Sequence, residues 1–181
     1  MSIRFEFDPD KLIEILLYVA PRVGGDMYRC LKILYLADKC HLERYGNVIT
    51  GDEYFALDYG PTPSKSYDII KYAAGRQSGY HHGATGARDA FSVTGNSITV
   101  LRDADVRHLS ASDIECLDAT IQKHKSKDFG SLKKIVHDDA YHATNRNQKI
   151  SIQAIASTLP NHSDIVQHLE DPYPGPSERP D

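Results

Sequence analysis

The chain of 181 residues contains no tryptophan, two methionines and three cysteines that form no CxxC pair. An odd number of cysteines without metal-type spacing argues against a disulfide framework and against a zinc site built on thiolates. Cys30 and Cys116 each stand in an apolar, helix-like pattern, where a free cysteine behaves as a small hydrophobic residue. This use of cysteine is typical of a reducing compartment, and we expect a cytoplasmic protein.

Long hydrophobic segments and an excess of positive charge are missing too. The longest apolar stretch, LIEILLYVA, is interrupted by Glu14 and is too short to cross a bilayer. The first ten residues, MSIRFEFDPD, lack the apolar run of a signal peptide. Lys and Arg total 21 against 25 Asp and Glu, a net charge of −4, whereas a nucleic-acid-binding protein normally shows a basic face. We therefore expect neither a membrane nor a nucleic acid as the main partner.

Motifs for metal binding and catalysis are also absent. The nine histidines include no HExxH motif, and neither His81-His82 nor the pair His137 and His142 has the spacing of ligands on one helix face. The chain has no GxSxG elbow and no phosphate-binding GKS or GKT. We expect no cofactor and no bound metal.

What is present predicts an α+β fold, a predominantly α-helical single domain with a short strand and a β-hairpin packed on the helices. Hydrophobic residues make up 40% and charged residues 25% of the chain, ordinary values for a globular domain. Apolar residues recur at helical spacing in several segments between start and stop signals. The first of these segments is expected to begin with Asp8 as N-cap and Pro9 as the first helical residue. We place the domain at residues 1–169 and expect the Pro-rich tail, residues 170–181, to be flexible.

Residues 46–75 carry turn and cap signals in close succession. Gly46 is expected to end a helix that begins after Asp26. The following EYFALDYG, residues 53–60, alternates as a half-buried strand does. Thr62 and Pro63 have the pattern of an N-cap and a first helical residue. Beyond Gly75, the glycine-rich residues 75–90 predict a mobile surface loop.

A β-hairpin and two helices are predicted downstream. In FSVTGNSITV, Gly95-Asn96 is a two-residue turn between alternating runs. Pairing across that turn places four apolar side chains on one face: Phe91, Val93, Ile98 and Val100. Ser112 and Glu115 have the spacing of a capping box at the start of a helix. Residues 131–144, SLKKIVHDDAYHAT, then predict one further helix.

Tyrosine is over-represented, with eleven residues, seven of them between Tyr28 and Tyr72. Its large ring and polar tip suit it to interfaces and to half-buried seams between elements. We expect Tyr54 and Tyr67 to pack at a strand–helix seam. Three others are expected to be available to a partner: Tyr45, Tyr59 and Tyr80.

The run KILYLADKCHLERYGNVITGDEYFALDYGPTPSKSYDIIK, residues 32–71, resembles the hallmark segment of the SocA-like antitoxin family, also called Panacea domains and formerly phage-associated proteins. The shared pattern comprises Ala-Asp, HL-x-x-YG, an ITGD turn and YGP-x-P. Its structural positions in this chain are Asp38, His41, Gly46, Gly51, Gly60, Pro61, Pro63 and Tyr67. SLKKIVHDDAY is similar to the family's closing signature, so the resemblance covers about residues 12–144.

The resemblance implies a cytoplasmic antitoxin that neutralises a cognate protein toxin by direct binding, without a cofactor or a reaction of its own. Related members pair with toxins of unrelated chemistry, so the toxin is not named by it, and homo-oligomerisation is left open. The candidate partner-binding residues are Tyr45, Asp52, Tyr59, Tyr80, His137 and Asp138.

Two alternatives are retained. One is an adaptor that delivers a partner to a protease. The other is a hydrolase-like enzyme that uses His137 and Asp138, with His41 or Asp52 in a shared cleft. A helix end stabilised by structural carboxylates accounts for the HDDAYH run more simply than catalysis does.

Overall fold

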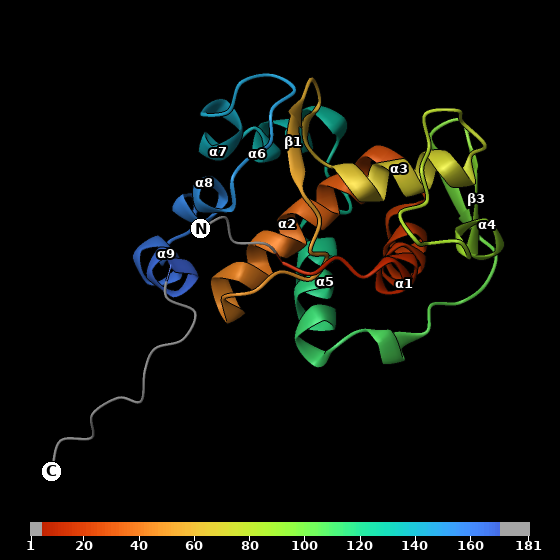
Figure 1. The fold of residues 1–181 in the computed structure, drawn as a ribbon, viewed down its shortest axis with the longest axis horizontal. Coiled ribbons are helices and arrows are strands. Elements are labelled where there is room, and N and C mark those ends of the chain that lie inside the picture. The colour runs from red at the N-terminus through yellow and green to blue at the C-terminus, as the bar shows by residue number, and fades with distance from the viewer. Residues whose placement is uncertain (1–4, 171–181) are drawn as a thin grey trace, which may run out of the picture.

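Two helices, α1 (Pro9–Val19) and α2 (Met27–Tyr45), form the centre of the fold (Figure 1). The structure, a computed structural model, describes residues 5–170. The Asp8 carboxylate accepts hydrogen bonds from the first turn of α1, and the Asp26 carboxylate accepts one from the first turn of α2. Gly46 ends α2 in the left-handed conformation, with φ 66°. Local cap residues thus set these boundaries as the sequence predicts.

The other elements surround α2. They are β1 (Tyr54–Leu57), β2 (Gly60–Pro63), α3 (Ser64–Ala73), α4 (Ala87–Ala90), β3 (Phe91–Thr94), β4 (Ser97–Val100), α5 (Ala111–His124), α6 (Phe129–Val136), α7 (Asp139–His142), α8 (Ile152–Ser157) and α9 (His162–Glu170), with 3₁₀ turns at Ala20–Val23 and Val106–His108. The predicted α+β, mostly helical fold is confirmed. The predicted tail lies, from residue 171 on, outside the described residues.

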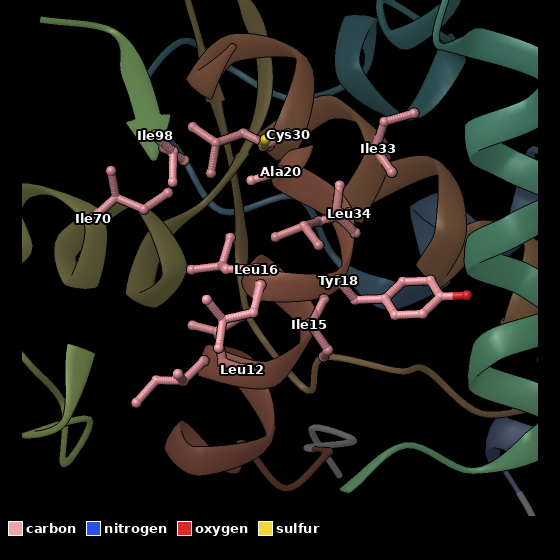
Figure 2. Packing of buried hydrophobic residues seen from close by; sticks show 14 of the residues in the cluster. Leu12, Ile15, Leu16, Tyr18, Ala20, Cys30, Ile33, Leu34, Ile70 and Ile98 are labelled. Atoms are coloured by element: carbon pink, nitrogen blue, oxygen red, sulfur yellow. The ribbon is translucent and has the colours of Figure 1, made fainter. Parts of the chain in front are cut away.

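The core has two parts, and α2 contributes to both. One part joins α1, α3, α5 and the β3–β4 hairpin to one side of α2. Figure 2 shows a portion of it, in which side chains of α1 and α2 lie together with Ile70 of α3 and Ile98 of β4. The second part contains Tyr35 and Leu42 of α2 with β1 and the helices α6 to α9. Since α2 is buried on both sides, it fixes the relative position of the two parts.

The β3–β4 hairpin has the predicted register. Phe91 pairs with Val100, and Val93 pairs with Ile98. Ser92 and Thr99 are exposed on the opposite face. The short turn sets this register locally, so a correct prediction needed no knowledge of the core.

The predicted single strand at residues 53–60 is instead one arm of a second antiparallel hairpin, in which β1 pairs with β2. Thr62 and Pro63 therefore belong to β2, and the prediction of Thr62 as the N-cap was wrong: the N-cap of α3 is Pro63, which makes no side-chain capping hydrogen bond. Helix α3 begins at Ser64 and is capped by Asp52, whose carboxylate accepts from the backbone N–H groups of Lys65 at 3.1 Å and Ser66 at 2.7 Å. A cap supplied from so far along the chain has no local sequence signal.

Three further predictions were wrong in detail. The capping box of α5 is formed by Ser110 and Asp113, not by Ser112 and Glu115. The predicted helix over residues 131–144 is broken into α6 and α7, because the Asp138 carboxylate accepts from the Tyr141 N–H and starts a new helix. The predicted loop over residues 75–90 is not wholly at the surface: it ends in α4 and buries three alanines, Ala84, Ala87 and Ala90.

Asp38 connects α2 to the hairpin. Its buried carboxylate accepts hydrogen bonds from the Ile49 N–H at 2.7 Å, the Thr50 N–H at 3.0 Å and the Tyr54 hydroxyl at 2.7 Å. It also accepts one from the Thr50 hydroxyl. Burial raises the pKa of the Asp38 carboxyl, while these donors act in the opposite direction. One side chain thus holds the 47–52 loop and β1 against α2.

We predict that Asp38→Ala lowers the free energy of unfolding by about 3 kcal/mol, because it leaves buried donors without an acceptor. Chemical denaturation followed by circular dichroism measures this loss. The control is Glu43→Ala, an exposed carboxylate on the same helix, which should change stability by less than about 0.5 kcal/mol. Equal losses in the two variants would contradict the role given to Asp38.

Candidate partner-binding surface

Three aromatic side chains from separate elements meet at the surface: Tyr28 of α2, Tyr59 of the β1–β2 turn and Phe129 of α6. We call them the aromatic cluster. The ring centroids of Tyr28 and Phe129 are 4.5 Å apart, and that of Tyr59 lies 5.9 Å from Phe129 and 6.5 Å from Tyr28. The Tyr28 hydroxyl also donates to the backbone carbonyl of Tyr59 at 3.2 Å. These contacts hold the rings as one unit.

The cluster is open to solvent. Tyr59 is 60% and Phe129 51% exposed. Within residues 5–170, the Tyr59–Phe129 contact is the one ring contact between two large hydrophobic side chains that are each more than half exposed. Large aromatic rings that touch at a surface without being buried are characteristic of a protein-binding site.

The turn that carries Tyr59 is fixed from several sides. Gly60 has φ 104°, and a Cβ atom there would come within 2.8 Å of Val136. Tyr141 donates to the backbone carbonyl of Leu57 at 2.9 Å. Asp58 forms a two-pronged ion pair with Arg146, with N–O distances of 2.6 and 2.8 Å. The hairpin turn is therefore preorganised, and Gly60 is needed because any side chain would push it off α6.

A buried lysine lies beneath the cluster. The Lys32 ammonium donates to the backbone carbonyl of Pro61 at 2.7 Å and to the Thr62 hydroxyl at 3.3 Å, and it lies 5.1 Å from the centroid of the Tyr28 ring. Within the described residues it forms no ion pair with a carboxylate. Burial lowers the pKa of Lys32 to about 7. Lys32 thus attaches β2 to α2 through neutral oxygen atoms.

His137 and Asp138 occupy the break between α6 and α7. Asp138 accepts from the Tyr35 hydroxyl at 2.9 Å and pairs with the Lys39 ammonium at 2.6 Å. The His137 ring stacks on Tyr141, with centroids 4.1 Å apart, and burial lowers the pKa of His137. Its buried Nε2 has no hydrogen-bond partner among the described residues. The HDDAYH run is thus a helix break in which the Asp138 carboxylate is engaged by the protein's own groups.

His41 and Tyr45 join α2 to α5. The carbonyl of Asn47 lies 2.9 Å from Nδ1 of His41, so Nδ1 donates to it, and Nε2 lies 3.1 Å from the Ser112 hydroxyl and 3.6 Å from the Asp113 carboxylate. Tyr45 is 46% exposed, and its hydroxyl donates to Glu115 at 2.6 Å. The hydrogen bond from Tyr45 lowers the pKa of the Glu115 carboxyl.

The remaining candidates lie in different places. Asp52 is half-buried and caps α3, and burial raises the pKa of its carboxyl against the pull of its donors. A Cβ atom at Gly51 would come within 3 Å of the backbone of Glu6, so only glycine fits there. Tyr80 is 57% exposed and stacks on His81, in the 75–86 segment at the opposite end of the molecule from α6 and α7 (Figure 1). Tyr54 is buried, and Tyr67 is half-buried.

The structure does not bring the polar candidates into one cleft. His41 bonds to the 47–52 loop and α5, Asp52 caps α3, and His137 and Asp138 lie between α6 and α7. A cavity of about 330 Å³ beside β1 is lined in part by Asp52 but by none of the other three. Across residues 5–170, no three His, Cys, Asp or Glu side chains converge as metal ligands would. In the same range no helix is long and apolar enough to span a membrane.

Sequence reasoning found Tyr59 but missed Tyr28, Lys32 and Phe129. Phe129 lies three residues before the buried Leu132, so helical periodicity assigns it to the core. It is exposed because α6 begins at the edge of α2. Lys32 contacts Pro61 and Thr62 through the tertiary structure, and no local sequence signal predicts this contact.

Comparison with known proteins gives the class. A family model described as antitoxin SocA-like, Panacea domain, matches residues 31–142. The chain therefore belongs to the SocA-like antitoxin family, as the hallmark segment predicts. The matched range runs from α2 to α7 and includes Lys32, Tyr59 and Phe129. No curated protein and no solved structure is significantly similar to the chain.

The buried amine of Lys32 predicts a pH-dependent stability. Its pKa is about 7 in the folded chain, below the ordinary 10.5, so between these values the unfolded state binds more protons. The free energy of unfolding should therefore rise with pH from 7.5 to 9.5, by about 1.4 kcal/mol per unit. Lys32→Met should abolish this slope, and Lys134→Met, at an exposed site, should keep it. Urea titrations at several pH values measure the slope; an unchanged slope in Lys32→Met would refute the assignment.

Proposed function

We propose that this chain is an antitoxin that neutralises a cognate protein toxin by direct binding, with the aromatic cluster as the main contact. The observation that supports the proposal is the exposed pair Tyr59 and Phe129, held together on a preorganised turn. Membership of the SocA-like antitoxin family gives the general class of function.

The energetics favour binding at this place. Aromatic side chains contribute much of the affinity of protein interfaces, because they bury a large area at a small cost in rotamer entropy. Here the turn is already ordered by Gly60, Tyr141 and Arg146 before a partner arrives. A partner would therefore lose little free energy in ordering this surface, so more of the interaction free energy would remain as affinity.

We expect co-expression with the toxin encoded beside this chain to restore growth and to yield a co-purifying complex. The measurements are colony formation under toxin induction and affinity purification of the tagged chain. If no neighbouring gene product is both neutralised and co-purified, direct binding is ruled out. If growth returns only in cells that retain an ATP-dependent protease, the chain acts as an adaptor and not by occupancy.

The double variant Tyr59→Ala/Phe129→Ala should weaken toxin binding by at least about a hundredfold, since two interface anchors are removed. Its thermal stability should change little, because both rings are more than half exposed. Leu101→Ala is the matched control, an exposed apolar residue (56%) outside the cluster. Isothermal titration calorimetry measures the affinities. Equal binding by the double variant and the control would exclude the cluster as the contact.

A further inference from the structure

The aromatic cluster lies beside a strongly basic segment. Residues 123–134, from the end of α5 through α6, contain five lysines and one aspartate, although the whole chain carries a net charge of −4. The lysines are Lys123, Lys125, Lys127, Lys133 and Lys134. No ion pair with a carboxylate engages any of them within residues 5–170. The Lys133 ammonium lies 5.7 Å from the centroid of the Tyr59 ring, so the positive charge reaches the cluster itself.

The nearby negative charges do not cancel this excess. Asp58 is already paired with Arg146. Asp128 accepts from the N–H and hydroxyl of Ser131 at 2.8 and 2.9 Å, as the N-cap of α6. Asp26 is likewise an N-cap, of α2. Asp58 is thus paired and the two other carboxylates cap helices, whereas no carboxylate pairs with any of the five lysines within residues 5–170.

Arg29 adds a further positive charge to this surface. The Arg29 guanidinium of α2 donates to the backbone carbonyl of Lys125. This contact fixes the end of α5 next to α2 without neutralising either charge, because the acceptor is a carbonyl. The surface therefore presents apolar rings with the Lys133 ammonium close to Tyr59 and with Arg29 next to Tyr28 on α2, an arrangement suited to an anion-rich partner.

We infer that the partner segment bound here is an acidic stretch of polypeptide carrying at least one large apolar side chain, which packs on Tyr59 and Phe129 while one of its carboxylates faces Lys133. The inference rests on the proposed function and specifies which part of a toxin the cluster recognises. Charges at the edge of an interface act chiefly on the association rate and on specificity.

A single-stranded nucleic acid is the competing occupant, since it too combines negative charge with rings. The geometry favours a polypeptide. Bases stack on aromatic rings that offer separate, open faces, whereas these rings are packed on one another, with Tyr59 at 69° to Phe129 and 85° to Tyr28. The net charge of −4 also opposes binding of a polyanion outside this segment.

The test uses the full chain and three fluorescent probes: an acetylated peptide of four Glu-Asp-Trp repeats, the same peptide with lysine in place of every acid, and a single-stranded oligothymidylate. We expect the acidic peptide alone to bind, with an affinity that falls as salt is added. Lys133→Glu and Phe129→Ala should each raise its Kd by about tenfold. The controls are Arg107→Glu, which changes the net charge equally at a residue whose side chain is 87% exposed, and Leu101→Ala; neither should have an effect.

Three results would overturn the inference: equal binding of the acidic and basic peptides, equal effects of Lys133→Glu and Arg107→Glu, or Lys133-dependent binding of oligothymidylate in place of the acidic peptide. Thermal melts of each variant show that it is folded. The growth assay separates this inference from the proposed function. Full rescue of growth by Lys133→Glu would overturn the inference and leave the antitoxin role standing. Binding of the acidic peptide without any rescue of growth by the unaltered chain would overturn the antitoxin role and leave an acidic-peptide site standing.

Discussion

The Asp38 carboxylate is the interaction on which the rest of this structure depends. It lies in the one helix that both parts of the core share, and it accepts hydrogen bonds from both the 47–52 loop and strand β1. A buried carboxylate is costly unless several donors surround it. Here the donors come from Ile49, Thr50 and Tyr54, so the cost of burial is offset only when the hairpin is correctly seated.

The position of the proposed binding surface follows from that seating. Once β1 lies against α2, the β1–β2 turn comes beside α6, and Lys32 bonds to β2 from below. Gly60 allows the close approach, and Tyr59 is left projecting next to Phe129. The aromatic cluster is thus held in place by the same contacts that fold the domain. The exposed rings add nothing to the core, which explains how they can be free to serve a partner.

Sequence reasoning succeeded where the signal is local. Asp8, Asp26 and Gly46 delimit the two central helices with their own side chains or backbone, and Gly95-Asn96 sets the register of β3 and β4. It failed where a distant residue supplies the cap or the pairing. Asp52 caps α3, and Thr62, which the sequence predicts as the N-cap of a helix, instead lies in strand β2. Within the aromatic cluster, the sequence singled out Tyr59 because tyrosine is over-represented in this chain. It did not single out Phe129, because helical periodicity assigns that residue to the core.

The sequence by itself determined the fold class, the family and the absence of recognisable catalytic motifs, because these are carried by composition, periodicity and a hallmark segment. Only the tertiary structure decided which side chains are exposed together. Tyr28, Tyr59 and Phe129 come from parts of the chain up to a hundred residues apart, and the lysines near them gain meaning only from that proximity. Contacts between distant segments depend on how whole elements pack, and no local pattern encodes that.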